Sequence, residues 1–212
     1  MAEIKAIDTL YNGYRFRSRL EARWAVFFDA AGIPYEYEPE GFVLYDGTTY
    51  LPDFYLPWFK AYVEIKRPNI SEREYEDAVL KCTLLHADGD GVIVLLCKGD
   101  PVDMNMEIFC ACYDDDEKLC VPWRDQAVFV EGAWWNELNE DGDYEERGDS
   151  KHHISIAVGD EFSDDGYLVF PHEDVHQFSA LSEYRSLLEE YRLKSRRARF
   201  EHGEKPLKTV AW

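Results

Sequence analysis

Residues 52–66 read PDFYLPWFKAYVEIK, and this stretch is the most informative about the fold of the chain. Side chains of two kinds alternate over residues 62–66, which predicts a β-strand. Glu64 and Lys66 therefore share one face of that strand. Pro57 fixes its own φ and has no N–H to donate, so we expect a turn there and a hairpin over the whole stretch.

The register of this hairpin brings two acids together. A turn centred between Trp58 and Phe59 places Asp53 directly opposite Glu64, with Cβ atoms about 4.5–5.5 Å apart. Two carboxylates at that distance repel each other unless a cation or a proton lies between them. Mg²⁺ prefers such hard oxygen ligands, so the hairpin predicts a divalent-metal site with Lys66 beside it. The alternative is an exposed hairpin with ordinary surface charges.

The segments around the hairpin predict further helices and strands. A helix is expected over residues 18–31, because its apolar side chains recur at helical spacing and Gly32 provides a stop. Ser18 suits the N-cap of this helix, and Glu21 suits the capping-box partner. The other expected elements are strands over 35–45, 48–56 and 61–66, a helix over 71–87 and a buried strand over 91–97.

The order helix, three strands, helix, strand predicts an α/β core with a mixed sheet over residues 1–100, because the last helix connects parallel strands. Residues 101–212 are predicted to form an acidic α+β extension with a long terminal helix. Its expected elements are short strands over 106–113, 126–130, 154–158 and 167–170, a loop over 137–149 and a helix over 179–202.

Composition narrows the class of protein. The 212 residues are 46% hydrophobic and include 12 Phe, 14 Tyr and 6 Trp, which suffices for a core and excludes a disordered chain. No apolar run reaches the length of about 18 residues that a membrane span needs, so we expect no membrane partner. The N-terminus lacks the order of a signal peptide, and five cysteines argue against a disulfide framework, so a cytoplasmic location is expected.

The formal net charge of −20 is unevenly distributed. Residues 1–70 hold 8 Lys and Arg against 10 Asp and Glu, while residues 71–212 hold 15 against 33. The predicted metal site therefore lies in the nearly neutral part of the chain. The acid excess elsewhere either keeps the protein soluble or acts as a nucleic-acid mimic or shield.

Three motifs give the chain a family resemblance. They are FRSRLEARWA at residues 16–25, LPDF at 51–54 and VEIK at 63–66. In this order they resemble the PD-(D/E)XK nuclease superfamily, which has a restriction-endonuclease-like αβββαβ core, and within it small phage and prophage endonucleases. The resemblance covers residues 11–97 and does not extend to the acidic region.

The resemblance implies a metal-dependent DNA endonuclease that hydrolyses phosphodiester bonds, acting in the host cytoplasm if phage-encoded. Asp53 and Glu64 would ligate Mg²⁺, or Mn²⁺ in its place, with the backbone carbonyl of Ile65 as a third oxygen. Lys66 would orient or deprotonate the attacking water, or stabilise developing negative charge. Glu21 matches an auxiliary acid that binds or positions a second metal, in addition to its local capping role.

Basic side chains supply candidate DNA contacts. Arg17, Arg19 and Arg23 surround Glu21, and they either bind phosphates or are solvated helix charges. The end of the predicted terminal helix is also basic, which either complements the helix macrodipole or provides a phosphate contact. Its cations are Lys194, Arg196, Arg197 and Arg199.

Other functions stay open at this point. The chain could be a non-catalytic acidic binding protein, a DNA mimic or counter-defence factor that targets a basic host protein. A nuclease of this kind could also act on RNA or on branched DNA alone, and a homodimer would provide two sites for a double-strand cut. Two weaker metal sites are Cys110 and Cys112 with Cys120, and the pair His172 and His176.

Overall fold

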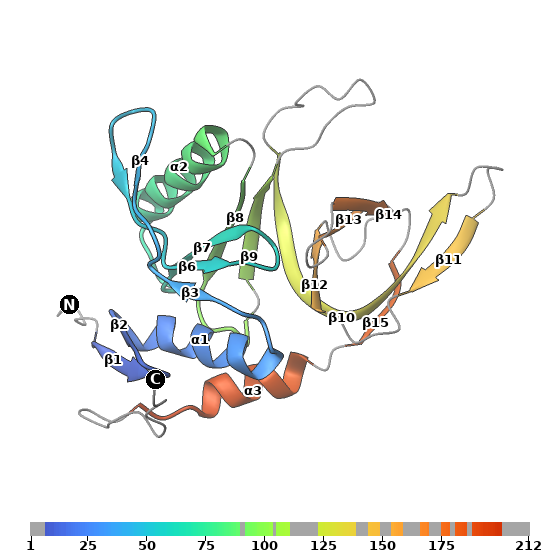
Figure 1. Cartoon of the computed structure of the whole chain (residues 1–212), viewed down its shortest axis with the longest axis horizontal. Helices are drawn as coiled ribbons and strands as arrows, with labels where there is room; N and C mark the ends of the chain where they lie inside the picture. The colour runs from blue at the N-terminus through green and yellow to red at the C-terminus, as the bar shows by residue number, and fades with distance from the viewer. Residues whose placement is uncertain are drawn as a thin grey trace.

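The computed structural model shows a mixed α/β protein (Figure 1), which confirms the predicted class. It describes residues 7–89, 92–103, 105–110, 123–138, 144–148, 154–158, 166–169, 175–178, 181–185 and 188–200. Three helices and two small sheets accompany one large sheet in these ranges. No helix among them is long and apolar enough to cross a membrane.

Helices α1 (Arg19–Ala31) and α2 (Glu72–Asp88) lie where the sequence predicts them. The Ser18 hydroxyl caps α1, and Gly32 ends it in the left-handed conformation, with φ of 72°. Ser71 begins α2 with a complete capping box. A hairpin that the sequence did not predict precedes α1, and it consists of β1 (Thr9–Tyr11) and β2 (Tyr14–Phe16).

The large sheet has eleven strands. Nine follow one another in the spatial order β14-β13-β12-β10-β9-β8-β7-β6-β3, and β11 and β15 pair with the rest of β10. Only β7 and β8 run parallel within the described sheet, and α2 connects them. Their bounds are β3 (Glu36–Tyr37), β6 (Phe54–Leu56), β7 (Ala61–Lys66), β8 (Ile93–Lys98), β9 (Asn105–Cys110), β10 (Trp123–Leu138), β11 (Tyr144–Gly148), β12 (Ile154–Val158), β13 (Gly166–Val169), β14 (Val175–Phe178) and β15 (Leu181–Arg185).

The two strands predicted over 35–45 and 48–56 are each divided in two, so their predicted lengths are wrong. The outer parts, β3 and β6, pair in the large sheet, whereas β4 (Phe42–Val43) and β5 (Thr49–Tyr50) form a separate hairpin. Prolines explain the breaks, because Pro39 and Pro52 cannot donate to a ladder. The predicted Asp-Gly turn is present, with Gly47 at φ of 83°.

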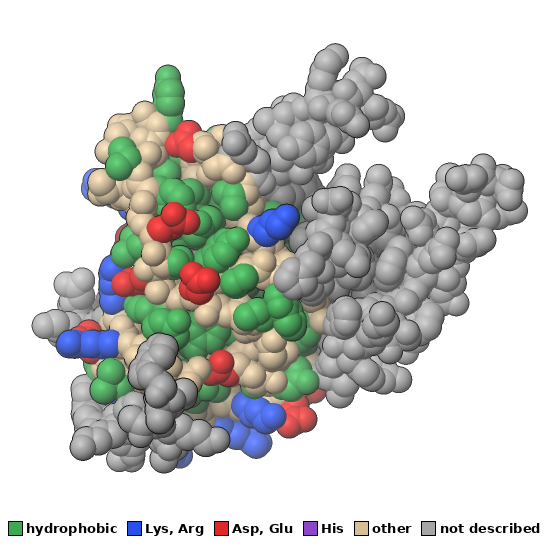
Figure 2. All heavy atoms as spheres, viewed as in Figure 1, with side chains coloured by type: hydrophobic (Ala, Val, Ile, Leu, Met, Phe, Trp, Pro, Cys, Tyr) green, Lys and Arg blue, Asp and Glu red, His purple; other side chains and the backbone are tan. Residues whose placement is uncertain are grey.

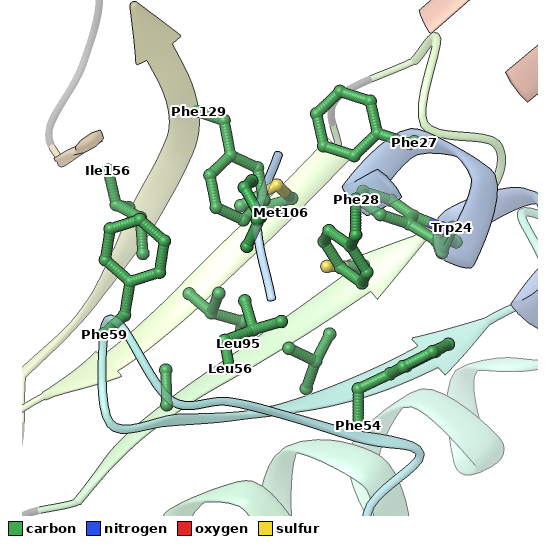
Figure 3. Close-up of a cluster of buried hydrophobic side chains, with 14 of the residues drawn as sticks. Trp24, Phe27, Phe28, Phe54, Leu56, Phe59, Leu95, Met106, Phe129 and Ile156 are labelled. Atoms are coloured by element: carbon green, nitrogen blue, oxygen red, sulfur yellow. The ribbon is translucent and has the colours of Figure 1, made fainter. Parts of the chain in front are cut away.

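Helices cover both faces of the sheet around β7 (Figure 1). One face packs against α1, together with α3 (Leu188–Arg197), and the other packs against α2. On the α1 face (Figure 3), the Phe28 ring centroid lies 5.4 Å from that of Phe54 and 6.2 Å from that of Phe129. The core and the sheet thus continue past residue 100, and the assignment of residues 1–100 and 101–212 to two regions stays a prediction.

The region after residue 100 corrects two expectations. The helix predicted over 179–202 begins only at Leu188, because residues 181–185 form β15 and pair with β10, so tertiary pairing overrides helical periodicity. The loop predicted over 137–149 contains β11, which also pairs with β10. The last residues of that helix prediction, 201 and 202, lie outside the described residues, as do 111–113 and 170 of the predicted strands.

Candidate functional site

The β6–β7 hairpin has the predicted register. Phe54 lies opposite Val63, Tyr55 opposite Tyr62 and Leu56 opposite Ala61. Four residues form the turn, centred between Trp58 and Phe59 as predicted, and the Phe59 N–H donates to the Leu56 carbonyl at 3.1 Å. Because the register is fixed, one more step along the two strands brings Asp53 level with Glu64.

The two faces of β7 have different neighbours. Val63 and Ile65 belong to the core cluster on the α1 face, while Tyr62 belongs to the cluster under α2. Since side chains alternate along a strand, Glu64 and Lys66 point to the α2 face. The sequence prediction that these two residues share one face is confirmed.

The Asp53 carboxylate is fixed against β7. Its Oδ2 atom accepts a hydrogen bond from the Ile65 N–H at 2.7 Å. Burial raises the pKa of the Asp53 carboxyl well above its usual range, and the charges of Glu64 and Glu21 raise it further. The opposing effects of the Ile65 N–H and of Lys66 are smaller. Negative charge at this point is therefore only partly balanced by the protein.

Glu64 is a buried carboxylate with two partners. Its side chain is 7% exposed, one oxygen pairs with the Lys66 ammonium, and the other accepts the Tyr50 hydroxyl at 2.9 Å. Burial, Cys82 and Glu64 raise the pKa of the Tyr50 phenol well above its usual value, so Tyr50 remains a hydrogen-bond donor. The contact fixes the orientation of Glu64.

Lys66 carries the positive charge of the site. Burial alone would lower the pKa of this ammonium, but the carboxylates of Glu64 and Asp53 outweigh burial, and the pKa is raised. Lys66 consequently stays protonated at neutral pH. It is suited to electrostatic stabilisation rather than to accepting a proton.

Glu21 has a local role at the start of α1, but the backbone N–H that its side chain accepts is that of Arg17 and not that of Ser18, and its role toward a metal stays a prediction. Its Oε2 atom accepts the Tyr37 hydroxyl at 2.7 Å and the Arg17 N–H at 3.0 Å, and its Oε1 atom accepts the Ser18 hydroxyl at 2.6 Å. The residue is 8% exposed, and its charge contributes to the raised pKa of Asp53. Glu21 thus holds the start of α1 and lies near the predicted metal ligands, with its oxygens already engaged.

The three predicted DNA-contacting arginines have different surroundings. Arg17 pairs with Glu38 at 2.6 Å and Arg23 with Asp100 at 2.8 Å. Arg19 is exposed, and no described carboxylate forms an ion pair with it. The pairs of Arg17 and Arg23 favour structural roles, whereas Arg19 is available to a ligand.

Sequence reasoning missed several residues on the α2 face. Lys98 is the register partner of Lys66, and both end a strand of the parallel pair. Glu107 is 3% exposed, and its carboxylate accepts a hydrogen bond from Arg124 Nε at 2.7 Å. Lys98 could have been found, because it ends the apolar run of residues 91–97 as Lys66 ends β7. Tyr50 gave no such signal.

The chemistry of these side chains fits a hard divalent cation. Asp53 and Glu64 offer carboxylate oxygens, and Oδ1 of Asp53 receives no hydrogen bond from the described residues. In an antiparallel pair of strands, the N–H and the C=O of one residue point toward the same neighbouring strand. Because the Ile65 N–H donates to Asp53, the Ile65 carbonyl also points toward that side of β7. No group of three or more His, Cys, Asp or Glu side chains in the described ranges is arranged to hold a metal, and the predicted ligands remain the two carboxylates and the Ile65 carbonyl.

The two weaker metal sites lie outside the described part of the chain. Their residues are Cys112, Cys120 and His172, with the side chains of Cys110 and His176.

Comparison with other proteins adds no relative: no family model matches the chain, and neither a curated protein nor a solved structure matches it.

Proposed function

We propose that the chain is a Mg²⁺-dependent DNA endonuclease, active also with Mn²⁺. The observation that carries the proposal is the Asp53–Ile65 hydrogen bond in the β6–β7 hairpin, which fixes Asp53 beside Glu64 and Lys66. Two acids that can hold a divalent metal, next to a cation that can stabilise developing negative charge, suit metal-assisted hydrolysis of a phosphodiester.

The element order supports a restriction-endonuclease-like core for this activity. In the large sheet and its helices the chain runs α1, β3, β6, β7, α2 and β8, with the β4–β5 hairpin inserted. The candidate residues gather where β7 leaves the sheet, beside β8. Ligands of α/β proteins commonly bind at the carboxyl ends of parallel strands.

Each residue of the site would have a distinct role in hydrolysis. Asp53, Glu64 and the Ile65 carbonyl would hold Mg²⁺, which when bound polarises the phosphate and acidifies water. Lys66, held charged by Glu64 and Asp53, would stabilise the negative charge that develops on the phosphate. Tyr50 keeps Glu64 oriented, and Glu21 keeps the start of α1 against the site.

Cleavage assays with substituted proteins test this proposal. Wild-type protein should nick or cut DNA in Mg²⁺ or Mn²⁺, and Asp53→Asn and Lys66→Ala should each remove the activity. The exposed Arg73→Ala, on α2, is the matched control for loss of a cation and should cleave like wild type. Linear, nicked, single-stranded and four-way-junction DNA, with RNA alongside, would define the substrate.

Two results would contradict the proposal. Cleavage that persists in both Asp53→Asn and Lys66→Ala would place the chemistry elsewhere. Absence of cleavage on every substrate, together with absence of any effect of Mg²⁺ or Mn²⁺ on the melting temperature, would favour the non-catalytic acidic binding protein.

A further inference from the structure

A strongly basic pocket lies outside the carboxylate site. It has a volume of about 540 Å³ and is formed where the end of α3 and the residues after it approach α1. Its lining is Arg19, Arg23, Arg196, Arg197 and Arg199, with Ala198 and Phe200. Lys and Arg side chains gather over α3 at the lower edge of the face shown in Figure 2.

Among the described residues, the charge of this pocket is largely unpaired. Arg23 forms an ion pair with Asp100, but no described carboxylate pairs with the other four arginines. Guanidinium groups stay protonated at all relevant pH values, so these side chains repel one another. The macrodipole of α3 accounts for cations in its last turn, but Arg19 belongs to α1, and Arg199 lies beyond the end of α3. Convergence of two segments that are far apart in the sequence is better explained by an anionic ligand.

We propose that this pocket binds the phosphodiester backbone of a nucleic acid strand, an assignment that rests on the proposed nuclease function for the identity of that strand. Guanidinium groups match phosphate geometry in bidentate fashion. A volume of about 540 Å³ is many times the roughly 30 Å³ that one water occupies in the liquid, so it admits more than a single small ion. Phe200 also lines the pocket, with its ring packed edge to face on Tyr11.

The position of the pocket relates it to the carboxylates. Arg19 and Arg23 are four residues apart and share one face of α1, while Glu21 lies between them in sequence and points to the other side. The pocket lies beside α1, whereas Glu64 and Lys66 point to the α2 face of the sheet, so a strand bound in the pocket would have to pass the end of β7 to reach them. The pocket would offset the net charge of −20 at the point where the strand approaches.

Binding measured without cleavage tests this inference. Fluorescence anisotropy of a labelled DNA strand, in EDTA, should give a dissociation constant that rises with salt. Arg196→Ala combined with Arg197→Ala should weaken binding about tenfold and reduce the salt slope by about 1.4 for a single strand, or about 1.8 for a duplex, if each arginine contacts one phosphate. Both residues are exposed, so folding should be unaffected.

The control is Arg15→Ala combined with Arg73→Ala, which removes the same charge from exposed positions outside the pocket and should leave the affinity and slope near wild type. Equal behaviour of the pocket and control variants would overturn the inference even if the protein cleaves DNA. Loss of binding in the pocket variant alone would support it even if no cleavage is found. Tight binding of a labelled polyglutamate peptide, equal to that of DNA and lost in the pocket variant, would instead assign the pocket to an acidic protein.

Discussion

Replacing Asp53 by Asn should abolish cleavage and at the same time stabilise the metal-free protein. The half-buried Asp53 carboxylate lies near Glu64 and Glu21, and desolvation together with these two charges raises its pKa. An amide has nearly the same shape, and its oxygen can still accept the Ile65 N–H that Oδ2 accepts at 2.7 Å. The substitution therefore removes a repelled charge and little else.

The size of the effect follows from the register. Directly opposed residues such as Asp53 and Glu64 have side chains about 5 Å apart. Two unit charges at that distance repel by about 3 kcal/mol at an effective dielectric constant of about 20. The Lys66 ammonium offsets much of this repulsion. A net gain of about 1 kcal/mol would raise the melting temperature by about 2–4 °C for a chain of this size.

The gain should depend on pH in a defined direction. Because the folded-state pKa of Asp53 is raised, the folded state binds its proton more tightly than the unfolded state does. The stability contributed by that proton is complete below the unfolded pKa of about 3.9 and is lost as the pH rises to the raised folded pKa. The difference in melting temperature between Asp53→Asn and wild type should accordingly be smallest near pH 4 and largest at neutral pH.

Thermal unfolding in EDTA, followed by titration with Mg²⁺ or Mn²⁺, measures both parts of this prediction. A cation at about 100 times its dissociation constant adds about 2.7 kcal/mol to the wild-type protein, and Asp53→Asn should lose most of that gain. Asp77→Asn, on the exposed face of α2, is the control and should retain it. The reasoning is refuted if Asp53→Asn melts lower than wild type in EDTA, or if the cation stabilises it as much.

Two further substitutions test the supports of the site and of the fold. Tyr50→Phe leaves the buried Glu64 without its hydroxyl donor, so we expect a loss of about 1–3 kcal/mol in the free energy of unfolding by urea and a reduced cleavage rate; unchanged stability would show that the contact is dispensable. Phe129→Ala removes a ring that packs against Phe28, and it should lower the free energy of unfolding by about 3–5 kcal/mol. We expect one unfolding transition for this variant. A second transition would mean that the region after residue 100 unfolds on its own.

The sequence was most informative where short-range rules act. Ser18 and Gly32 define α1 because capping depends on local geometry, and the hairpin register follows from alternation and from Pro57. Asp53, Glu64 and Lys66 could be placed together for the same reason. The local role of Glu21 at the start of α1 was also readable, but its hydrogen bond with Tyr37 depends on β3 being beside α1, which no local pattern shows.

Long-range pairing accounts for what could not be predicted. Residues 181–185 have a helical pattern of apolar residues, yet they pair with β10, a partner some 50 positions away in the chain. Tyr50 reaches Glu64 only because the β4–β5 hairpin folds over the α2 face, and Arg196 meets Arg19 only because α3 packs on α1. Such neighbours follow from the assembled sheet and are not encoded in spacing.

Cleavage of supercoiled DNA in Mg²⁺ by Glu64→Gln, compared with Glu76→Gln, shows most clearly whether the carboxylates of the β6–β7 hairpin carry the activity. Both substitutions remove one carboxylate charge, but Glu64 is buried in the site and Glu76 is exposed on α2. The account predicts that wild type and Glu76→Gln cleave at the same rate and that Glu64→Gln does not cleave. Equal cleavage by the two variants would contradict it.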